Sequence, residues 1–227
     1  MKILRTLLIG IAVCALLVVG GCCVLPTALH ALNPDVTYRV PGAGKTLFLS
    51  LDDGPSEATP LILDVLRKHH VHATFFVITD HIQPEIMQRI IAEGHQVANH
   101  LKTSASLGKL SDDQFRADFQ TSDKALSAFS YVKLLRPPGG SISAERAQYV
   151  KSQGYGIMVG TVFPLDHWLE NKAVIETLAK ALVIDGGIVI LHDTNTRGPR
   201  SAVVLDELIP ELKAKGYGFA LLPAPKA

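Results

Sequence analysis

The sequence that follows residue 29 contains no cysteine. All three cysteines of this 227-residue chain, Cys14, Cys22 and Cys23, lie before that point. A disulfide framework and a cysteine metal site are therefore excluded for most of the chain. Because a single hydrophobic core is workable up to roughly 250 residues, we expect one domain that its core holds together without covalent cross-links.

A basic cluster is also absent. The chain has 22 lysines and arginines against 21 acidic residues, and Lys2 and Arg5 belong to the N-terminal segment, which leaves 20 basic residues elsewhere. This near-neutral balance offers little to a nucleic-acid backbone. We expect no nucleic-acid partner, and no feature of the sequence indicates a protein partner.

A phosphate-binding loop is lacking too. "PGAGKT", residues 41–46, resembles the end of the GxxxxGK[ST] pattern. However, Arg39 occupies the place of the leading glycine, and the segment precedes a predicted strand instead of following one. We therefore do not interpret it as a nucleotide site.

Residues 6–26 carry no charge and follow Lys2 and Arg5. This arrangement is typical of a secretory signal peptide or of a membrane helix, and the run is about as long as the ~20 residues that span a bilayer. No good small-x-small cleavage site follows it, which favours an uncleaved anchor, although "VGGC" at Cys22 loosely resembles a lipobox. We predict that residues 1–29 are a signal peptide or membrane anchor.

The remainder is then exported. It is expected to be tethered to the membrane in the cell envelope or periplasm, or secreted if the segment is cleaved. Residues 30–45 contain two prolines and no apolar periodicity, so we predict a connector there and a domain over residues 46–227.

Apolar strand-like runs alternate with amphipathic helical ones in the predicted domain. This order predicts a parallel sheet covered by helices, either an open doubly wound sheet or a closed barrel. Ser111 and Gln114 form a capping-box pattern that predicts the start of one helix. The expected strands cover residues 46–51, 72–78, 95–100, 131–136, 155–160, 187–192 and 217–222.

Polar residues gather where these strands end, which is where parallel α/β folds place their active sites. Asp52 and Asp53 are adjacent acids, and if the turn directs both carboxylates into one pocket, one can bind a metal and the other a water. The simpler interpretation is an Asp-Gly-Pro turn whose acids are solvated. A lone histidine at a strand end is more often structural than a ligand, but one near two acids makes metal binding credible. The residues concerned are Asp52, Asp53, His100, Arg136, Asp166, His192 and Asp193.

Further interpretations follow from local chemistry. Arg136 precedes two prolines and two glycines in "LRPPGG" and can lower the pKa of a nearby carboxylate, while the N–H of Gly139 can donate to an oxyanion. His192 suits a proton donor if Asp166 raises its pKa. Trp168 either stacks on a sugar or simply packs. His69, His70, His72 and His95 are interpreted as structural.

The segments "SLDDGP", "HATFFVI", "GHQVANH", "LRPPGG" and "GGIVILHD" occur in an order that resembles the polysaccharide deacetylase (NodB-homology, carbohydrate esterase) family over about residues 46–222. The resemblance implies an irregular (β/α) barrel of seven or eight units that hydrolyses N-acetyl or O-acetyl groups on a glycan with a divalent metal. By position the resemblance implies that Asp52 is the general base and that Arg136 positions it. It implies that His192 is the general acid, paired with Asp166. It further implies that Asp53 and His100 are metal ligands and that Pro138, Gly139, Trp168 and Leu191 are substrate-binding residues.

Two positions depart from the family pattern. The family usually has a second metal histidine four residues after the first, where this chain has Ser104, and an aromatic residue where it has Gly139. "GTVFPLDHW", residues 160–168, looks more like a chitin-deacetylase-like subgroup. Catalytic zinc normally keeps three protein ligands, so we expect zinc, with cobalt and manganese as alternatives, to bind weakly.

Two functions fit these residues. The favoured one is a membrane-tethered deacetylase that removes acetyl groups, N-acetyl first among them, from an exported or envelope polysaccharide. The alternative is a catalytically impaired, deacetylase-like glycan-binding protein in which His100 is only structural. Metal dependence distinguishes the two.

Overall fold

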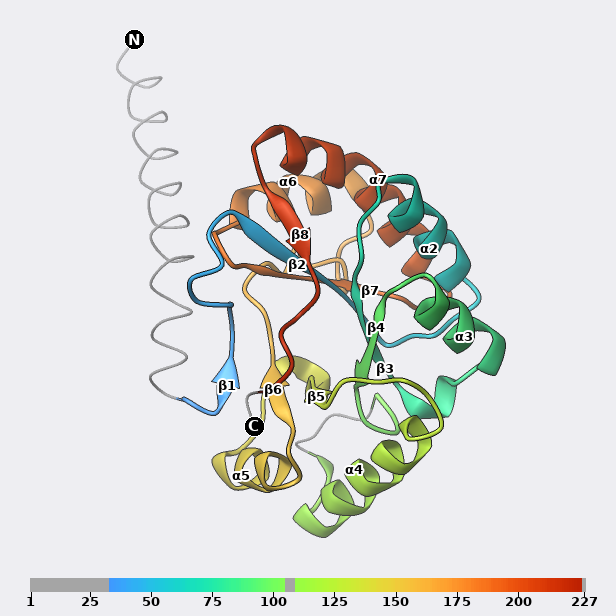
Figure 1. The fold of residues 1–227 in the computed structure, drawn as a ribbon, viewed down its shortest axis with the longest axis vertical. Coiled ribbons are helices and arrows are strands. Elements are labelled where there is room, and N and C mark those ends of the chain that lie inside the picture. Colours follow the sequence, from blue (N-terminus) through green and yellow to red (C-terminus); the bar gives the residue numbers. More distant parts are fainter. Residues whose placement is uncertain (1–32, 105–108, 226–227) are drawn as a thin grey trace.

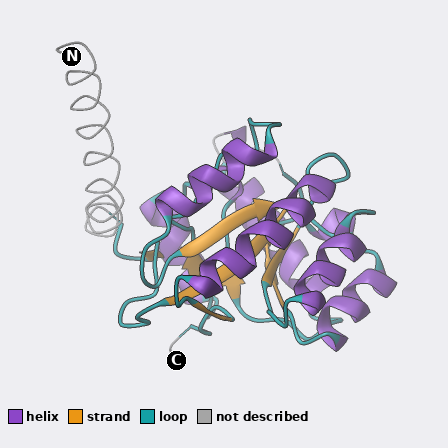
Figure 2. Cartoon of the chain, turned by 90° about the horizontal axis from the view of Figure 1, so that it is seen from above, coloured by secondary structure: helices purple, strands orange, loops and turns teal. Residues whose placement is uncertain are grey.

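A computed structural model describes residues 33–104 and 109–225. Its strands are β1 (Val36–Thr37), β2 (Thr46–Asp52), β3 (Thr74–Val77), β4 (Gln96–Asn99), β5 (Leu134–Leu135), β6 (Gly156–Met158), β7 (Ile188–His192) and β8 (Gly218–Ala220). Its α-helices are α2 (Thr59–Lys68), α3 (Pro84–Ala92), α4 (Asp112–Leu126), α5 (Ala144–Ser152), α6 (Lys172–Leu182) and α7 (Gly198–Ala214). The strands lie in the middle of the domain and the helices pack around them (Figures 1 and 2).

All strand pairs of the described sheet are parallel, in the order β1-β6-β5-β4-β3-β2-β7, with β8 beside β2. An isolated parallel bridge joins Val162, on the segment after β6, to Val189 of β7. The sheet therefore curls round, and the predicted α/β fold with parallel strands is confirmed in a form that fits an irregular barrel.

The hydrophobic pattern predicted the strands well. Each of the seven expected strands is present, shortened at one or both ends except over residues 46–51, where β2 runs on to Asp52. The pattern missed β1, which lies in the segment predicted as a connector. Val36 is only 1% exposed and packs with Phe119 and Ile157, so this part of the segment contributes to the core.

The predicted N-terminal anchor, residues 1–29, lies outside the described residues. Among the helices that the structure does describe, none combines the length and the apolarity needed to cross a bilayer.

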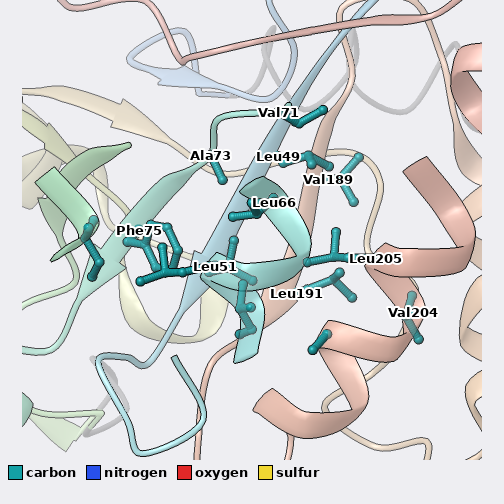
Figure 3. Packing of buried hydrophobic residues seen from close by; sticks show 14 of the residues in the cluster. Leu49, Leu51, Leu66, Val71, Ala73, Phe75, Val189, Leu191, Val204 and Leu205 are labelled. Atoms are coloured by element: carbon teal, nitrogen blue, oxygen red, sulfur yellow. The ribbon is translucent and has the colours of Figure 1, made fainter. Parts of the chain in front are cut away.

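The largest core cluster fills the space between the sheet and its outer helices. Leu49 and Leu51 of β2 meet Leu66 of α2 and Leu205 of α7, and Leu191 of β7 packs among them (Figure 3). Side chains alternate between the two faces of a strand, so the neighbours of these residues point to the inner side of the curled sheet. This alternation determines which residues line the site.

Local sequence signals start the helices. Ser111 accepts a hydrogen bond from the N–H of Gln114, and the Gln114 side chain accepts one from the N–H of Ser111, which is the predicted capping box of α4. Pro60 and Pro84 stand in the first turns of α2 and α3, where no intrahelical N–H is lost. Gly94 follows α3 with a φ of +81°, a conformation that favours glycine at helix ends.

Candidate functional site

A cavity of about 340 Å³ opens at the carboxyl ends of the strands. Residues from five separate segments of the chain line it. They include Asp52, Asp53, His100, Ser104, Arg136, Pro138, Gly139, Gly160, Phe163, His167, Trp168, Ile190 and His192. Nearly every residue that the sequence predicted for the site therefore borders one cavity.

Asp52 ends β2, and Arg136 follows β5. Arg136 Nη1 donates to Oδ1 of Asp52 at 2.6 Å and to the Ser50 hydroxyl at 2.8 Å. The guanidinium is 2% exposed and lies 4.0 Å from the centre of the Phe76 ring. It also donates to the backbone carbonyls of Met158, the last residue of β6, and of Val159. This buried network holds the Asp52 carboxylate in one position at the cavity wall.

Asp53 begins the turn after β2 with a φ of +72°. Its Oδ1 lies 3.5 Å from Nε2 of His100, and its Oδ2 lies 3.5 Å from Nη1 of Arg197. Burial opposes ionisation of Asp53, but the hydrogen bond and charge of His100, with the charges of His192 and Arg197, lower its pKa to about 2. The Asp53 carboxylate is therefore ionised at neutral pH.

His100 follows β4 and is buried. Its Nδ1 lies 2.7 Å from the carbonyl oxygen of Arg136. Because a carbonyl only accepts, Nδ1 carries a hydrogen, and Nε2 is the ring nitrogen that faces Asp53. One carboxylate and one imidazole are donors that zinc accepts, and the hydrogen bond on Nδ1 orients the ring as in protein metal sites. The two predicted metal ligands fit a divalent cation.

Asp166, on the segment after β6, orients His192 at the end of β7. Its carboxylate oxygens lie 2.9 and 3.0 Å from Nδ1 of His192, and Oδ2 accepts the His192 backbone N–H at 2.8 Å. Burial disfavours the imidazolium, but the hydrogen bond and charge of Asp166, with the charges of Asp52 and Asp53, raise the pKa of His192. The pair suits a proton donor at neutral pH.

The predicted substrate-binding residues divide into two groups. Pro138, Gly139 and Trp168 line the cavity, with Trp168 70% exposed and in edge contact with Phe163. Leu191 does not line it, which corrects the prediction. Leu191 packs in the outer core beside Leu205 (Figure 3), because it lies on the opposite face of β7 from His192.

Ile190 and His167 are cavity residues that the sequence interpretation missed. Ile190 shares the face of β7 with His192, and counting alternate positions along the strand would have found it in place of Leu191. His167 stands between Asp166 and Trp168, and its ring centre is 5.2 Å from that of His192. In the sequence, His167 is marked only by its position in "DHW", residues 166–168.

Asp193 supports the turn that carries Asp53. It accepts hydrogen bonds from the hydroxyls of Ser56 at 2.8 Å and Thr59 at 2.6 Å, and its N–H donates to the carbonyl of Asp52. Burial raises the pKa of Asp193 to about 6 against the effect of these hydroxyls. This residue links the ends of β2 and β7.

The histidines predicted to be structural lie apart from the cavity. His95 is buried and accepts the N–H of Ala73 through Nδ1 at 3.1 Å, and His69 pairs with Asp206. Asp112, at the start of α4, pairs with Arg146 at 2.6 Å.

Comparison with known proteins places these residues in a family context. A sequence model of the polysaccharide deacetylase family matches residues 39–158. A peptidoglycan-N-acetylglucosamine deacetylase of Bacillus cereus is 32% identical over 182 residues, which are 78% of this chain and 66% of that protein. A second protein of that name from the same species is 31% identical over 191 residues, with 81% and 89% covered.

Solved structures share the fold. The crystal structure of the Bc1960 peptidoglycan N-acetylglucosamine deacetylase, in complex with 4-naphthalen-1-yl-N-oxidanyl-benzamide, superposes with a TM-score of 0.79 at 29% identity and covers 83% of this chain and 91% of its own. BA3943, a CE4 family pseudoenzyme from Bacillus anthracis, superposes with a TM-score of 0.76 at 27% identity, covering 86% and 69%. Enzymes and a pseudoenzyme thus share this architecture.

Proposed function

Because the chain belongs to the polysaccharide deacetylase family, we propose that it is a metal-dependent hydrolase that removes acetyl groups from a cell-envelope or exported polysaccharide. The chain is an enzyme of the carbohydrate deacetylase class, a hydrolase of carbon–nitrogen bonds. The observation that carries the proposal is the convergence of three pairs, Asp52–Arg136, Asp53–His100 and Asp166–His192, on one cavity.

The proposed chemistry is amide hydrolysis. Asp53 and His100 hold the divalent cation, zinc first among the candidates, which when bound polarises the acetyl carbonyl and makes water easier to deprotonate. Asp52 takes the proton from the attacking water, because the hydrogen bond from Arg136 fixes the position of its carboxylate. The N–H of Gly139, at the cavity wall, donates to the oxyanion that develops.

His192 completes the reaction by protonating the departing nitrogen. Asp166 keeps the His192 ring in the orientation that presents Nε2, and the hydrogen bond and charge of Asp166 raise the pKa of His192, which favours the protonated form. One water is consumed, and acetate and a free amine are formed. Ile190 and Trp168 border the space left for the acetyl methyl group and the sugar ring.

The proposal is tested by acetate release from N-acetylglucosamine oligomers and from acetylated cell-wall glycan. We expect turnover with added zinc, cobalt or manganese, loss of turnover with a chelator, and a loss of at least about 100-fold for Asp52→Asn, since general base catalysis contributes typically 10²–10⁴-fold. Unchanged melting behaviour of the variant excludes unfolding as the cause. Turnover that survives Asp52→Asn would contradict the assigned base.

A second function, glycan binding without catalysis, is favoured by Ser104 and by the likeness to the BA3943 pseudoenzyme. Calorimetry with the same oligosaccharides distinguishes the two. Saccharide binding that is indifferent to chelator and to Asp53→Ala, without acetate release, supports the binding protein, whereas a metal requirement supports the enzyme.

The proposed location is the outer side of a membrane, with the N-terminal segment as signal peptide or anchor. The uncharged run 6–26 after Lys2 and Arg5 supports this part of the proposal. Recovery of the full chain in the membrane fraction, accessible to added protease, is the expected result, and recovery of the intact chain in the cytoplasm would contradict it.

A further inference from the structure

His167 is a cavity residue that the proposed mechanism does not use. It lies on the segment between β6 and α6, directly after the buried Asp166, and its own side chain is exposed. One ring nitrogen of His167, one of His192 and one carboxylate oxygen of Asp53 all lie within 4.8 Å of one another. Of the described residues, these form the only cluster of three or more histidines, cysteines and acids with such spacing.

This donor set suits a divalent cation. Zinc binds imidazole nitrogens at about 2.0–2.1 Å and carboxylate oxygens at about 2.0–2.2 Å, so donors around one ion lie roughly 3–4 Å apart. To hold one ion the three atoms must come closer by side-chain rotation, and the His167 side chain is exposed, whereas His192 is buried.

A second observation, independent of the spacing, is the orientation of His192. Its Nδ1 donates to the buried carboxylate of Asp166, which leaves Nε2 as the nitrogen available to a ligand. Carboxylate–histidine–metal arrangements of this kind fix the tautomer and raise the basicity of ligating histidines. Asp166 thus prepares His192 equally well for proton donation and for metal binding.

We propose that Asp53, His167 and His192 form a cation site at the mouth of the cavity, and that zinc bound there inhibits deacetylation. The inhibition rests on the proposed function, because the ion occupies the His192 nitrogen that donates the proton. Asp53 serves both this site and the pair it forms with His100, so one ion at a time is favoured. With Ser104 in place of an imidazole, the His167 site offers one more strong protein ligand than the Asp53–His100 pair.

The binding part is tested on the purified full chain by competition with a colorimetric zinc chelator and by the visible spectrum of bound Co²⁺. We expect His167→Asn to weaken zinc binding at the tightest site by at least about 10-fold and to change the Co²⁺ spectrum. Mutation of a residue that only hydrogen-bonds to a metal ligand already lowers metal affinity by typically 10 to 100-fold. The matched control is His70→Asn, an exposed histidine at a positive φ of 51° that asparagine tolerates. Ser104→Ala is expected to leave the tightest site unchanged.

Wild-type zinc affinity in both His167→Asn and His167→Gln, or a loss confined to Ser104→Ala, overturns the proposal. The catalytic part is tested by acetate release at increasing zinc. Because the two sites share Asp53, we expect wild-type turnover to rise with zinc to a low plateau, and His167→Asn to reach a higher plateau. Equal plateaus in both proteins overturn the inhibitory role. If neither protein releases acetate at any zinc level, the proposed function fails, while the affinity measurement still decides the site.

Discussion

At the scale of single residues, Arg136 is the side chain on which the site depends most. It is buried against Phe76 and donates to Asp52, to Ser50 and to two backbone carbonyls at the end of β6. A planar guanidinium with five donors meets all of these partners at once, which a lysine ammonium does not. Its role is therefore both structural and electrostatic.

We predict that Arg136→Met lowers the free energy of unfolding by about 3–5 kcal/mol, because it leaves the buried Asp52 carboxylate without its counter-charge. The double variant Asp52→Asn with Arg136→Met is expected to be more stable than Arg136→Met alone. Urea unfolding at neutral pH measures both. A double variant no more stable than the single one would show that the ion pair is not the source of the loss.

His95 leads to a prediction about pH. Burial, and then the charge of His72, lower its pKa from 6.5 to about 4 in the folded chain. As pH falls below 6.5 the unfolded chain takes up a proton that the folded chain refuses, so stability decreases between pH 6.5 and 4, by roughly 1 kcal/mol per pH unit. Protonation also removes the acceptor for the Ala73 N–H.

His95→Asn, whose side-chain oxygen can accept the same N–H, is expected to flatten this decrease. Urea unfolding of both proteins at several pH values between 4 and 7 gives the comparison. Parallel pH profiles would rule out His95 as the responsible group.

At the scale of elements, β7 shows how strand alternation divides adjacent residues. Ile190 and His192 face the cavity, whereas Leu191 packs against α7. A shift of one residue along a strand moves a side chain from the cavity face of the sheet to the face that packs against the helices. A pocket role assigned to the adjacent residue of a strand is therefore wrong. Motif order located β7, but only its orientation in the sheet separated Ile190 from Leu191.

The start of α4 gives a prediction at this scale. Ser111→Ala removes the side-chain acceptor of the capping box, which typically costs about 1 kcal/mol of stability. Ser127→Ala, at the other end of the helix, is the control and is expected to stay within about 0.5 kcal/mol of the wild type. Thermal or urea unfolding measures both, and equal effects would show that the cap adds nothing.

At the scale of the whole molecule, closure of the curled sheet depends on a close approach at Gly160. A Cβ there would lie 2.7 Å from Cδ1 of Ile190 and 3.0 Å from the carbonyl oxygen of Ile188. The adjoining residues pair with β7 through Val162. A side chain at Gly160 therefore pushes the segment after β6 away from β7.

We predict that Gly160→Ala lowers stability by about 1–3 kcal/mol, the usual cost of overpacking, and weakens saccharide binding because Gly160 and Ile190 both line the cavity. Gly218→Ala is the matched control, since its Cβ would meet nothing nearer than 4.0 Å. Urea unfolding and calorimetry check the two parts. Wild-type stability in Gly160→Ala would show that the closure tolerates a side chain.

Much of the site was predictable because its residues follow strands. Asp52, Asp53, His100, Arg136, Asp166 and His192 were predicted to meet, and all of them line or adjoin one cavity. The short strand β1 escaped prediction because two residues show no periodicity, and Val36 is identified as core only by its pairing with β6. His167 escaped because a loop histidine has no pattern of its own.

The amino-acid sequence by itself determined the parallel α/β class, the helix caps and the family, because hydrophobic periodicity and ordered motifs are local properties that survive without coordinates. Only the tertiary structure decided which face of β7 meets the cavity, how Arg136 joins Asp52 to the opposite strand, and that His167 approaches Asp53 and His192. The physical reason is that these contacts join residues far apart in the chain, and their distances depend on how the sheet curls.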